Sequence, residues 1–338
     1  MNFGSDTTAP AHPDVLEAMS RVNTGTEASY GNDAVMARLR DTIARVFATE
    51  DFDFWITASG TASNALALSC FCPSTGAVLC HEEAHIERDE RGAPGFFSGG
   101  GTLRLLPGFG AKIDPQAFIR AINANNPDFV HETPLHVLSL TNLTECGLVY
   151  RPEEISAFAD RAKAAGLAVH LDGARFANAL IAAGAMPSGL SWMAGVDVLT
   201  LGLTKTGAAG CEIILLFGAA RAKFQELRVR AKRTGHMPPK MRFLAAQAEA
   251  MFAGSLWTRL AGHANRKARD LAEGFEARGF HLAYPCEGNE VFVDLPAPVA
   301  EKLKAAGAVF YGWPGGSSRF VCSWATQDSE IEALLAAL

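Results

Sequence analysis

Short runs of apolar residues alternate with segments of helical periodicity along the first 240 residues. Six runs have the length and apolar content of buried strands, namely Phe54–Thr57, Ala77–Cys80, Val137–Leu140, Ala168–Leu171, Val196–Leu201 and Glu212–Phe217. Helical periodicity occupies four segments between or after them: Ser63–Cys72, Pro152–Ala165, Phe176–Ala183 and Arg221–Arg233. This alternation predicts an α/β fold with a mostly parallel sheet that helices cover on both faces.

The pattern changes near Gly235–Pro239. Two long helices are expected beyond it, followed by shorter strands and a last helix from Asp328. These helices are Lys240–Leu260 and Gly262–Arg278, and the strands are Glu290–Leu295, Ala308–Gly312 and Phe320–Ser323. The sequence therefore predicts a large domain over residues 1–240 and a small C-terminal α+β domain over residues 241–338.

Composition excludes several classes of protein. The 338 residues are 49% hydrophobic, which is enough for one large core and a smaller one, and the net charge of −6 disfavours nucleic-acid and anionic membrane partners. No apolar run approaches the roughly 18 residues of a membrane span, and the first residues do not resemble a signal peptide. The seven cysteines have no C-x-x-C spacing, so we expect reduced thiols in a cytoplasmic protein without a metal site.

Lys205 is the first candidate for chemistry. It ends the apolar run Val196–Thr204 and precedes the small residues Thr206–Gly210. A lysine that leaves a buried strand is partly desolvated, which favours its neutral, nucleophilic form. Alone, the position also fits a lysine that reaches from a strand end into solvent.

Asp172 adds a second group to the same edge of the predicted sheet. It follows the strand Ala168–Leu171, about thirty residues before Lys205, so both side chains are expected in one crevice. Pyridoxal phosphate needs this pair, because a lysine forms the Schiff base and an acid keeps the pyridine nitrogen protonated. Taken alone, Asp172 also fits the N-cap of the following helix.

The segment after the first strand fits a phosphate site. Ser59, Gly60 and Thr61 stand where the strand Phe54–Thr57 passes into a helix, and Ser63 follows one turn later. The helix start presents free N–H groups to an anion, the hydroxyls add donors, and the glycine permits a tight turn. The segment matches neither a P-loop nor a dinucleotide-binding motif.

Three further side chains complete the candidate site. His85 follows the strand Ala77–Cys80 and is placed to stack on a pyridine ring or to move a proton, although His81 is a competitor and either histidine also fits a structural role. Arg175 and Arg319 are the candidates for binding a substrate carboxylate, which a guanidinium binds with two parallel hydrogen bonds.

Together these motifs resemble the L-threonine aldolases, which are fold type I, pyridoxal-phosphate-dependent enzymes of the aspartate-aminotransferase-like superfamily. The resemblance covers nearly the whole chain and is greatest for low-specificity bacterial enzymes that also accept phenylserine. It rests on Ser5–Thr7, Tyr30–Asp33, Ser59–Asn64, Glu83–His85, His170–Arg175, Thr204–Lys205 and Arg319. One departure is Thr144, which stands where many family members carry a second active-site histidine.

The resemblance implies a seven-stranded sheet and a homotetramer of close dimers with active sites at the dimer interface. In such an assembly Lys232, Arg233 or Arg242 reaches the phosphate of a neighbouring subunit. No nucleic-acid or membrane partner is expected.

The implied reaction is retro-aldol cleavage of a β-hydroxy-α-amino acid to glycine and an aldehyde. Lys205 would form the Schiff base, Asp172 would face the ring nitrogen, and His85 would stack on the ring and act as base. Ser5, Arg175 and Arg319 would hold the substrate carboxylate. A β-eliminating lyase or an aminotransferase would use the same lysine and aspartate, and a cofactor-binding regulator without turnover is a further alternative.

Overall fold

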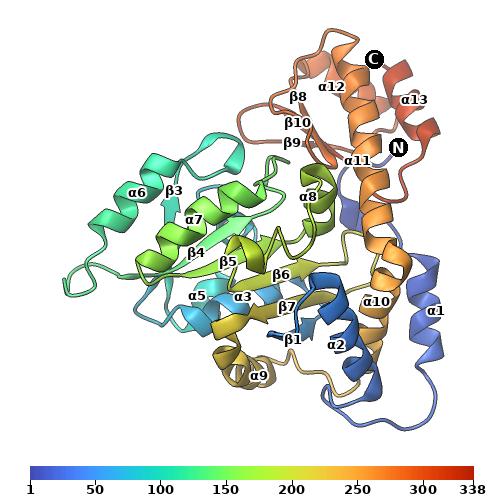
Figure 1. Ribbon diagram of the computed structural model, residues 1–338. Helices are drawn as coiled ribbons and strands as arrows, with labels where there is room; N and C mark the ends of the chain where they lie inside the picture. The colour runs from blue at the N-terminus through green and yellow to red at the C-terminus, as the bar shows by residue number, and fades with distance from the viewer.

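The computed structural model describes residues 1–338, in which a seven-stranded sheet forms the centre of the larger part (Figure 1). The strand order is β1-β7-β6-β5-β4-β2-β3, and only β7 runs antiparallel to its two neighbours. These strands are β1 (Phe52–Thr57), β2 (Ala77–His81), β3 (Thr102–Leu106), β4 (Leu135–Thr141), β5 (Ala168–Gly173), β6 (Val198–Gly202) and β7 (Glu212–Phe217). The expected mostly parallel seven-stranded sheet is confirmed.

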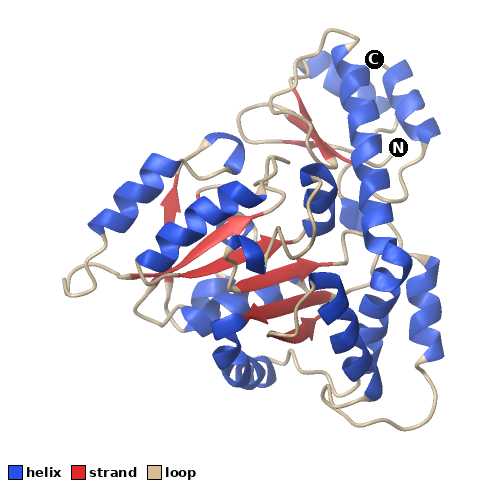
Figure 2. Ribbon diagram, viewed as in Figure 1, coloured by secondary structure: helices blue, strands red, loops and turns tan.

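Helices cover both faces of this sheet, as the view coloured by secondary structure makes plain (Figure 2). Helices α3, α5 and α9 lie on one face and α7 and α8 on the other, while α1, α2 and α10 pack together at the β1 end. The helices of this part are α1 (Pro13–Arg21), α2 (Ala34–Phe47), α3 (Gly60–Phe71), α4 (His85–Arg88), α5 (Ala93–Ser98), α6 (Pro115–Ala124), α7 (Pro152–Ala164), α8 (Phe176–Ala183), α9 (Phe224–Arg233) and α10 (Arg242–Phe252).

A small antiparallel sheet with order β8-β10-β9 forms the second part, together with the last helices. The expected small α+β unit near the C-terminus is therefore present. Its elements are α11 (Leu256–Glu276), β8 (Glu290–Val293), α12 (Ala297–Ala305), β9 (Tyr311–Gly312), β10 (Ser318–Val321) and α13 (Asp328–Ala336). None of the helices in the structure combines the length and the apolar character that a bilayer crossing requires.

Two hydrophobic cores correspond to the two sheets. The larger core extends to Ala261, and the smaller one joins Ala268 to Phe3, so the long helix α11 contributes to both. The Phe3 and Phe320 rings lie 6.1 Å apart, which anchors the N-terminal segment on the small sheet. Helix α10, which follows residue 240, packs on α1 and α2 within the larger core. The boundary between the two domains at residue 240 therefore stays a prediction.

The helices after residue 240 break at a different place from the one expected. The prediction put the break between Leu260 and Gly262, whereas the chain leaves helical geometry at Gly254 and Ser255, with φ of +53° and +56°. Gly262 lies inside α11. A helical glycine costs only about 1 kcal/mol relative to alanine, and packing of α11 on α8 overrides that cost.

Candidate active site

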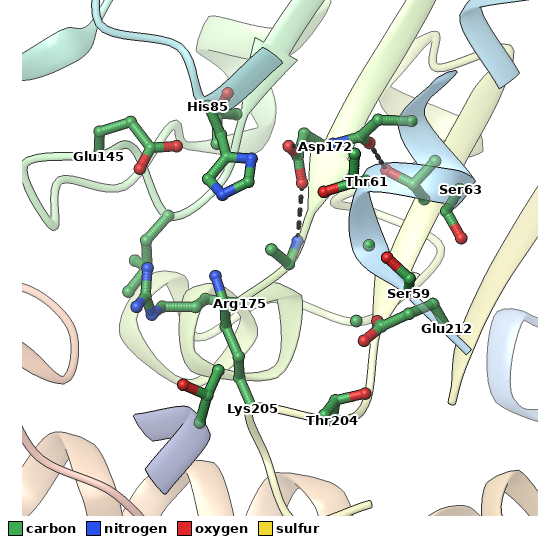
Figure 3. A pocket seen from close by; sticks show the side chains of 18 of the residues that line it. Ser59, Thr61, Ser63, His85, Glu145, Asp172, Arg175, Thr204, Lys205 and Glu212 are labelled. Carbon is green, nitrogen blue, oxygen red and sulfur yellow. Dashed lines mark hydrogen bonds between the residues drawn. The ribbon is translucent and has the colours of Figure 1, made fainter. Parts of the chain in front are cut away.

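The carboxyl ends of the parallel strands meet at one edge of the large sheet, where they border a cavity of about 260 Å³. Ala58 follows β1, Thr141 and Asp172 lie at the ends of β4 and β5, and Lys205 follows β6. Figure 3 shows Asp172 and Lys205 at this cavity. Seven of the predicted site residues line this cavity: Ser59, Gly60, Thr61, His85, Asp172, Arg175 and Lys205.

Asp172 is a buried carboxylate held by two donors. Asn64 Nδ2 donates to its Oδ2 over 2.8 Å, and the Ala174 backbone N–H donates to its Oδ1 over 3.0 Å. Asn64 is itself fixed, because its Oδ1 accepts a hydrogen bond of 2.6 Å from Thr200 Oγ1. The carboxylate is thereby oriented into the cavity before any ligand arrives.

Lys205 leaves β6 into a tight turn. Its Nζ points into the cavity, and it has no hydrogen-bond or ion-pair partner in the protein (Figure 3). Gly207, two residues on, has a φ of +139°, and a Cβ there would lie 3.0 Å from Leu260 Cδ1. The turn therefore needs glycine, and it presents an amine that is free to react with a carbonyl group.

The start of α3 forms a cradle for an anion. Ser59 is the N-cap, yet its hydroxyl makes no capping hydrogen bond, so both this hydroxyl and the first N–H groups of the helix stay available. Space is open around Gly60, since a Cβ placed there would meet no atom within 4 Å. The site fits the phosphate that the sequence predicts for this segment.

His85, rather than His81, enters the cavity. His85 Nδ1 lies 2.9 Å from Oε1 of the buried Glu90, which also accepts a hydrogen bond of 2.8 Å from Asn64. Burial opposes protonation of His85, but the Glu90 hydrogen bond and nearby carboxylates outweigh it and raise the pKa of the imidazole. His81 instead bonds the Gly108 carbonyl oxygen and the Glu83 N–H, which is a structural role.

Arg175 is buried between two carboxylates at the cavity wall. Its Nε and Nη2 donate to Asp6 over 2.8 and 3.2 Å, and its Nη1 lies 3.4 Å from Glu290 Oε2. Burial alone would raise the pKa of Asp6, but the charges of Arg175 and Lys205 overcome it and lower that pKa. The guanidinium is therefore held in one orientation beside the cavity.

The structure does not bring Ser5 and Arg319 to the wall of the cavity. The Ser5 hydroxyl accepts a hydrogen bond from the Thr7 N–H, and Thr7 lines the cavity in its place. Arg319 lies over the Trp313 ring, with Nε 3.9 Å from Oε1 of Glu290. Their assignment to the substrate carboxylate stays a prediction.

Sequence reasoning missed several residues of the site. Asn64 belongs to the Ser59–Asn64 motif, but the sequence assigned it no role. The residues around Glu90 and Glu145 form no motif that would predict a function for either glutamate. Glu212, the first residue of β7, also lines the cavity, and burial raises its pKa to about 7. No group of three or more His, Cys, Asp or Glu side chains is arranged to hold a metal ion.

Known proteins share this architecture and much of this sequence. Residues 2–298 match the family described as Beta-eliminating lyase. A low specificity L-threonine aldolase of Pseudomonas aeruginosa is 42% identical, over 98% of this chain and 95% of its own length. This chain belongs to the Beta-eliminating lyase family. The enzyme of the same description from a Pseudomonas species is 40% identical over 99% and 96% of the two chains.

Structural neighbours agree with this membership. A threonine aldolase of Leishmania major superposes with a TM-score of 0.91 at 26% identity, covering 99% of this chain and 97% of the other. An aspartate aminotransferase variant of Thermus thermophilus, 18% identical, superposes with a TM-score of 0.72 over 99% and 94% and shares the fold. The expected fold type I architecture and the membership of the lyase family are confirmed.

Proposed function

We propose that this lyase cleaves L-threonine, L-allo-threonine and related β-hydroxy-α-amino acids, such as phenylserine, to glycine and an aldehyde in a reversible retro-aldol reaction. The free Lys205 amine facing the oriented Asp172 carboxylate across one cavity supports a pyridoxal-phosphate reaction. The observation that favours aldol cleavage over other such reactions is the activity named for the two bacterial relatives, which match nearly the full chain.

Family and fold indicate pyridoxal phosphate, held through a lysine Schiff base, as the cofactor. The cavity fits this group. Lys205 would provide the Schiff base, Asp172 would face the ring nitrogen, and the start of α3, with Ser59, Gly60 and Thr61, would bind the phosphate. When bound, the cofactor supplies a sink for the electron pair released at Cα.

Arg175 binds the substrate carboxylate in this proposal, with Arg319 and Ser5 as further candidates. Asp6 takes two of the five guanidinium N–H donors of Arg175, and Glu290 Oε2 lies 3.4 Å from Nη1, so the two carboxylates fix the orientation and leave the remaining donors for a substrate. The substrate is then held at two points, its carboxylate at Arg175 and its amine near the position of Lys205 Nζ. Holding both points fixes the direction of the Cα–Cβ bond. That orientation decides which bond at Cα breaks.

A substrate panel tests the proposed function. We expect aldehyde release from L-threonine, L-allo-threonine and L-phenylserine, but not from D-threonine, because the amine and carboxylate are held at fixed points. A β-eliminating lyase or an aminotransferase is the second candidate, and it would share Lys205 and Asp172. Absence of aldehyde from every L-substrate would reject the aldolase proposal.

His85 is proposed to stack on the cofactor ring and is the first candidate for proton transfer. We expect His85→Asn to lower turnover while cofactor absorbance is retained, because Lys205 and the α3 cradle are unchanged. Loss of a general acid–base group costs roughly 10²–10⁴-fold in turnover, and loss of stacking alone costs less. Steady-state rates with L-threonine measure the effect, and wild-type turnover in this variant would exclude both roles.

We further propose a homotetramer in the cytoplasm, with each active site at a dimer interface. The surface of α5 and α9 supports an interface, because Phe96 and Val229 are 82% and 57% exposed there, beside Arg233. Lys232, Arg233 and Arg242 do not line the cavity of their own chain, which agrees with a role across an interface. All seven cysteines are free, as in a reducing compartment. Sedimentation equilibrium would measure the assembly.

A further inference from the structure

Glu145 is a buried carboxylate at the cavity wall that the proposed roles leave unused. It lies in the turn after β4, and its side chain lies beside His85 at the cavity (Figure 3). The preceding Thr144 fixes this turn, because its Oγ1 donates to the Gly110 carbonyl oxygen over 2.8 Å and accepts from the Leu148 N–H over 3.1 Å. Thr144 is thus structural, and Glu145 is the group that the turn presents to the cavity.

No protein group pairs with the Glu145 carboxylate, although the residue is only 8% exposed. Burial raises the pKa of Glu145 to about 7, even though nearby positive charges act in the opposite direction. The titratable and charged groups that face it are His85, Lys205, Asp172 and Arg175. A buried carboxylate without a partner is costly to a fold, which favours a functional reason for its presence.

His85 and Glu145 differ in the partners that the protein gives them. His85 Nδ1 is already engaged by Glu90 Oε1 over 2.9 Å, whereas the Glu145 carboxylate has no partner in the protein. Glu145 has both a free carboxylate and a pKa near the working pH, where a general base is most effective. The two neighbouring side chains therefore fit different roles.

We propose that the Glu145 carboxylate accepts the β-hydroxyl proton of the substrate during cleavage, while His85 packs on the cofactor. This inference rests on the proposed aldolase function. The O–H bond breaks, its proton moves to a carboxylate oxygen, and its electron pair becomes the second C–O bond of the leaving aldehyde. The Cα–Cβ pair stays with Cα, where a proton is added to give glycine, and Glu145 then returns its proton to solvent.

The test compares two reactions of the holoenzyme. Cleavage of L-threonine needs a base at the β-hydroxyl, whereas exchange of the glycine α-proton in D₂O needs the cofactor and the carboxylate site but no such base. We expect Glu145→Gln to lower kcat for cleavage by roughly 10²–10⁴-fold, with KM and glycine exchange near wild type. Glu145→Asp keeps the carboxylate and is expected to retain part of the activity.

Glu83→Gln is the matched control, because Glu83 precedes His85 by two residues but lies outside the cavity and pairs with Arg88. We expect wild-type cleavage from it. His85→Asn is expected to lower cleavage and exchange together. In the wild type, kcat/KM should rise with pH through about 7 as Glu145 loses its proton, and Glu145→Gln should remove the part of this rise that depends on Glu145.

Infrared spectroscopy gives a readout that does not depend on turnover. Two buried carboxyls, Glu145 and Glu212, are expected to titrate near pH 7 in the wild-type holoenzyme, and Glu145→Gln should remove one of the two bands and leave the other. Equal losses of cleavage and exchange, or unchanged cleavage, would overturn the role of Glu145. A wild-type enzyme that exchanges glycine but releases no acetaldehyde would instead overturn the proposed function.

Discussion

Replacing Lys205 by alanine is expected to abolish the visible absorbance of the bound cofactor and to lower turnover on the order of 10⁴-fold or more. Lys205 is the lysine at the cavity, and its amine has no protein partner, so no other side chain is placed to form the Schiff base. Absorbance spectra of the purified variant with added pyridoxal phosphate, together with acetaldehyde release from L-threonine, measure both effects.

A surface lysine provides the control for this variant. Lys304 lies on α12 in the small C-terminal part, away from the large sheet, and pairs with Glu301. Lys304→Ala should therefore keep both the absorbance and the turnover. Because Lys205 is not part of a core or an ion pair, Lys205→Ala should also fold normally. Survival of the visible band in Lys205→Ala would show that the Schiff base forms elsewhere.

The second large effect is expected from Asp172→Asn. An amide of the same shape has one acceptor oxygen, so it can accept from either Asn64 Nδ2 or the Ala174 N–H but not from both, and it has no charge to stabilise a protonated ring nitrogen. Loss of one oriented electrostatic group at a reacting centre costs roughly 10²–10³-fold or more in turnover. We expect a loss of that size, with cofactor binding retained, measured as kcat with L-threonine and as visible absorbance.

Asp197 is the matched control for Asp172. It lies at the opposite edge of the same sheet, where its carboxylate accepts a hydrogen bond of 2.8 Å from the Val169 N–H and lies 3.1 Å from Lys163 Nζ. Asp197→Asn should lower the free energy of unfolding slightly and leave kcat unchanged. Wild-type turnover in Asp172→Asn would contradict the assignment of Asp172 to the ring nitrogen.

Buried strands were predictable from the sequence, and the exposed edge strand was not. The central strands are continuous apolar runs because helices cover both faces, and such runs stand out from their surroundings. Strand β3, Thr102–Leu106, lies at the sheet edge and is mostly exposed or half-exposed, with Arg104 at its centre. Its mixed composition gives no clear strand signal, and only pairing with β2 identifies it.

The residues at strand ends were also predictable, because parallel strands bring their carboxyl ends to one edge whatever the details of packing. Lys205, Asp172 and the Ser59–Thr61 segment all depend on this rule, and the structure places all of them around one cavity. Their individual roles stay predictions.

Contacts between distant segments could not be read from the sequence. Asn64 meets an aspartate 108 residues away in the chain, and Glu90 reaches the cavity network only through the fold of the segment after His85. Ser5 and Arg319 were chosen by position, but a local turn and a buried glutamate engage them outside the cavity wall. Such partners depend on packing of both cores, which no local pattern encodes.

The central claim is that this lyase cleaves the Cα–Cβ bond of threonine, and a product balance tests it most directly. The holoenzyme is incubated with L-threonine in the absence of any oxoacid, and acetaldehyde, glycine, 2-oxobutanoate and ammonia are quantified. The proposed function predicts acetaldehyde and glycine in equal amounts. Formation of 2-oxobutanoate and ammonia, or turnover only after an oxoacid is added, would contradict it and identify an eliminating lyase or an aminotransferase instead.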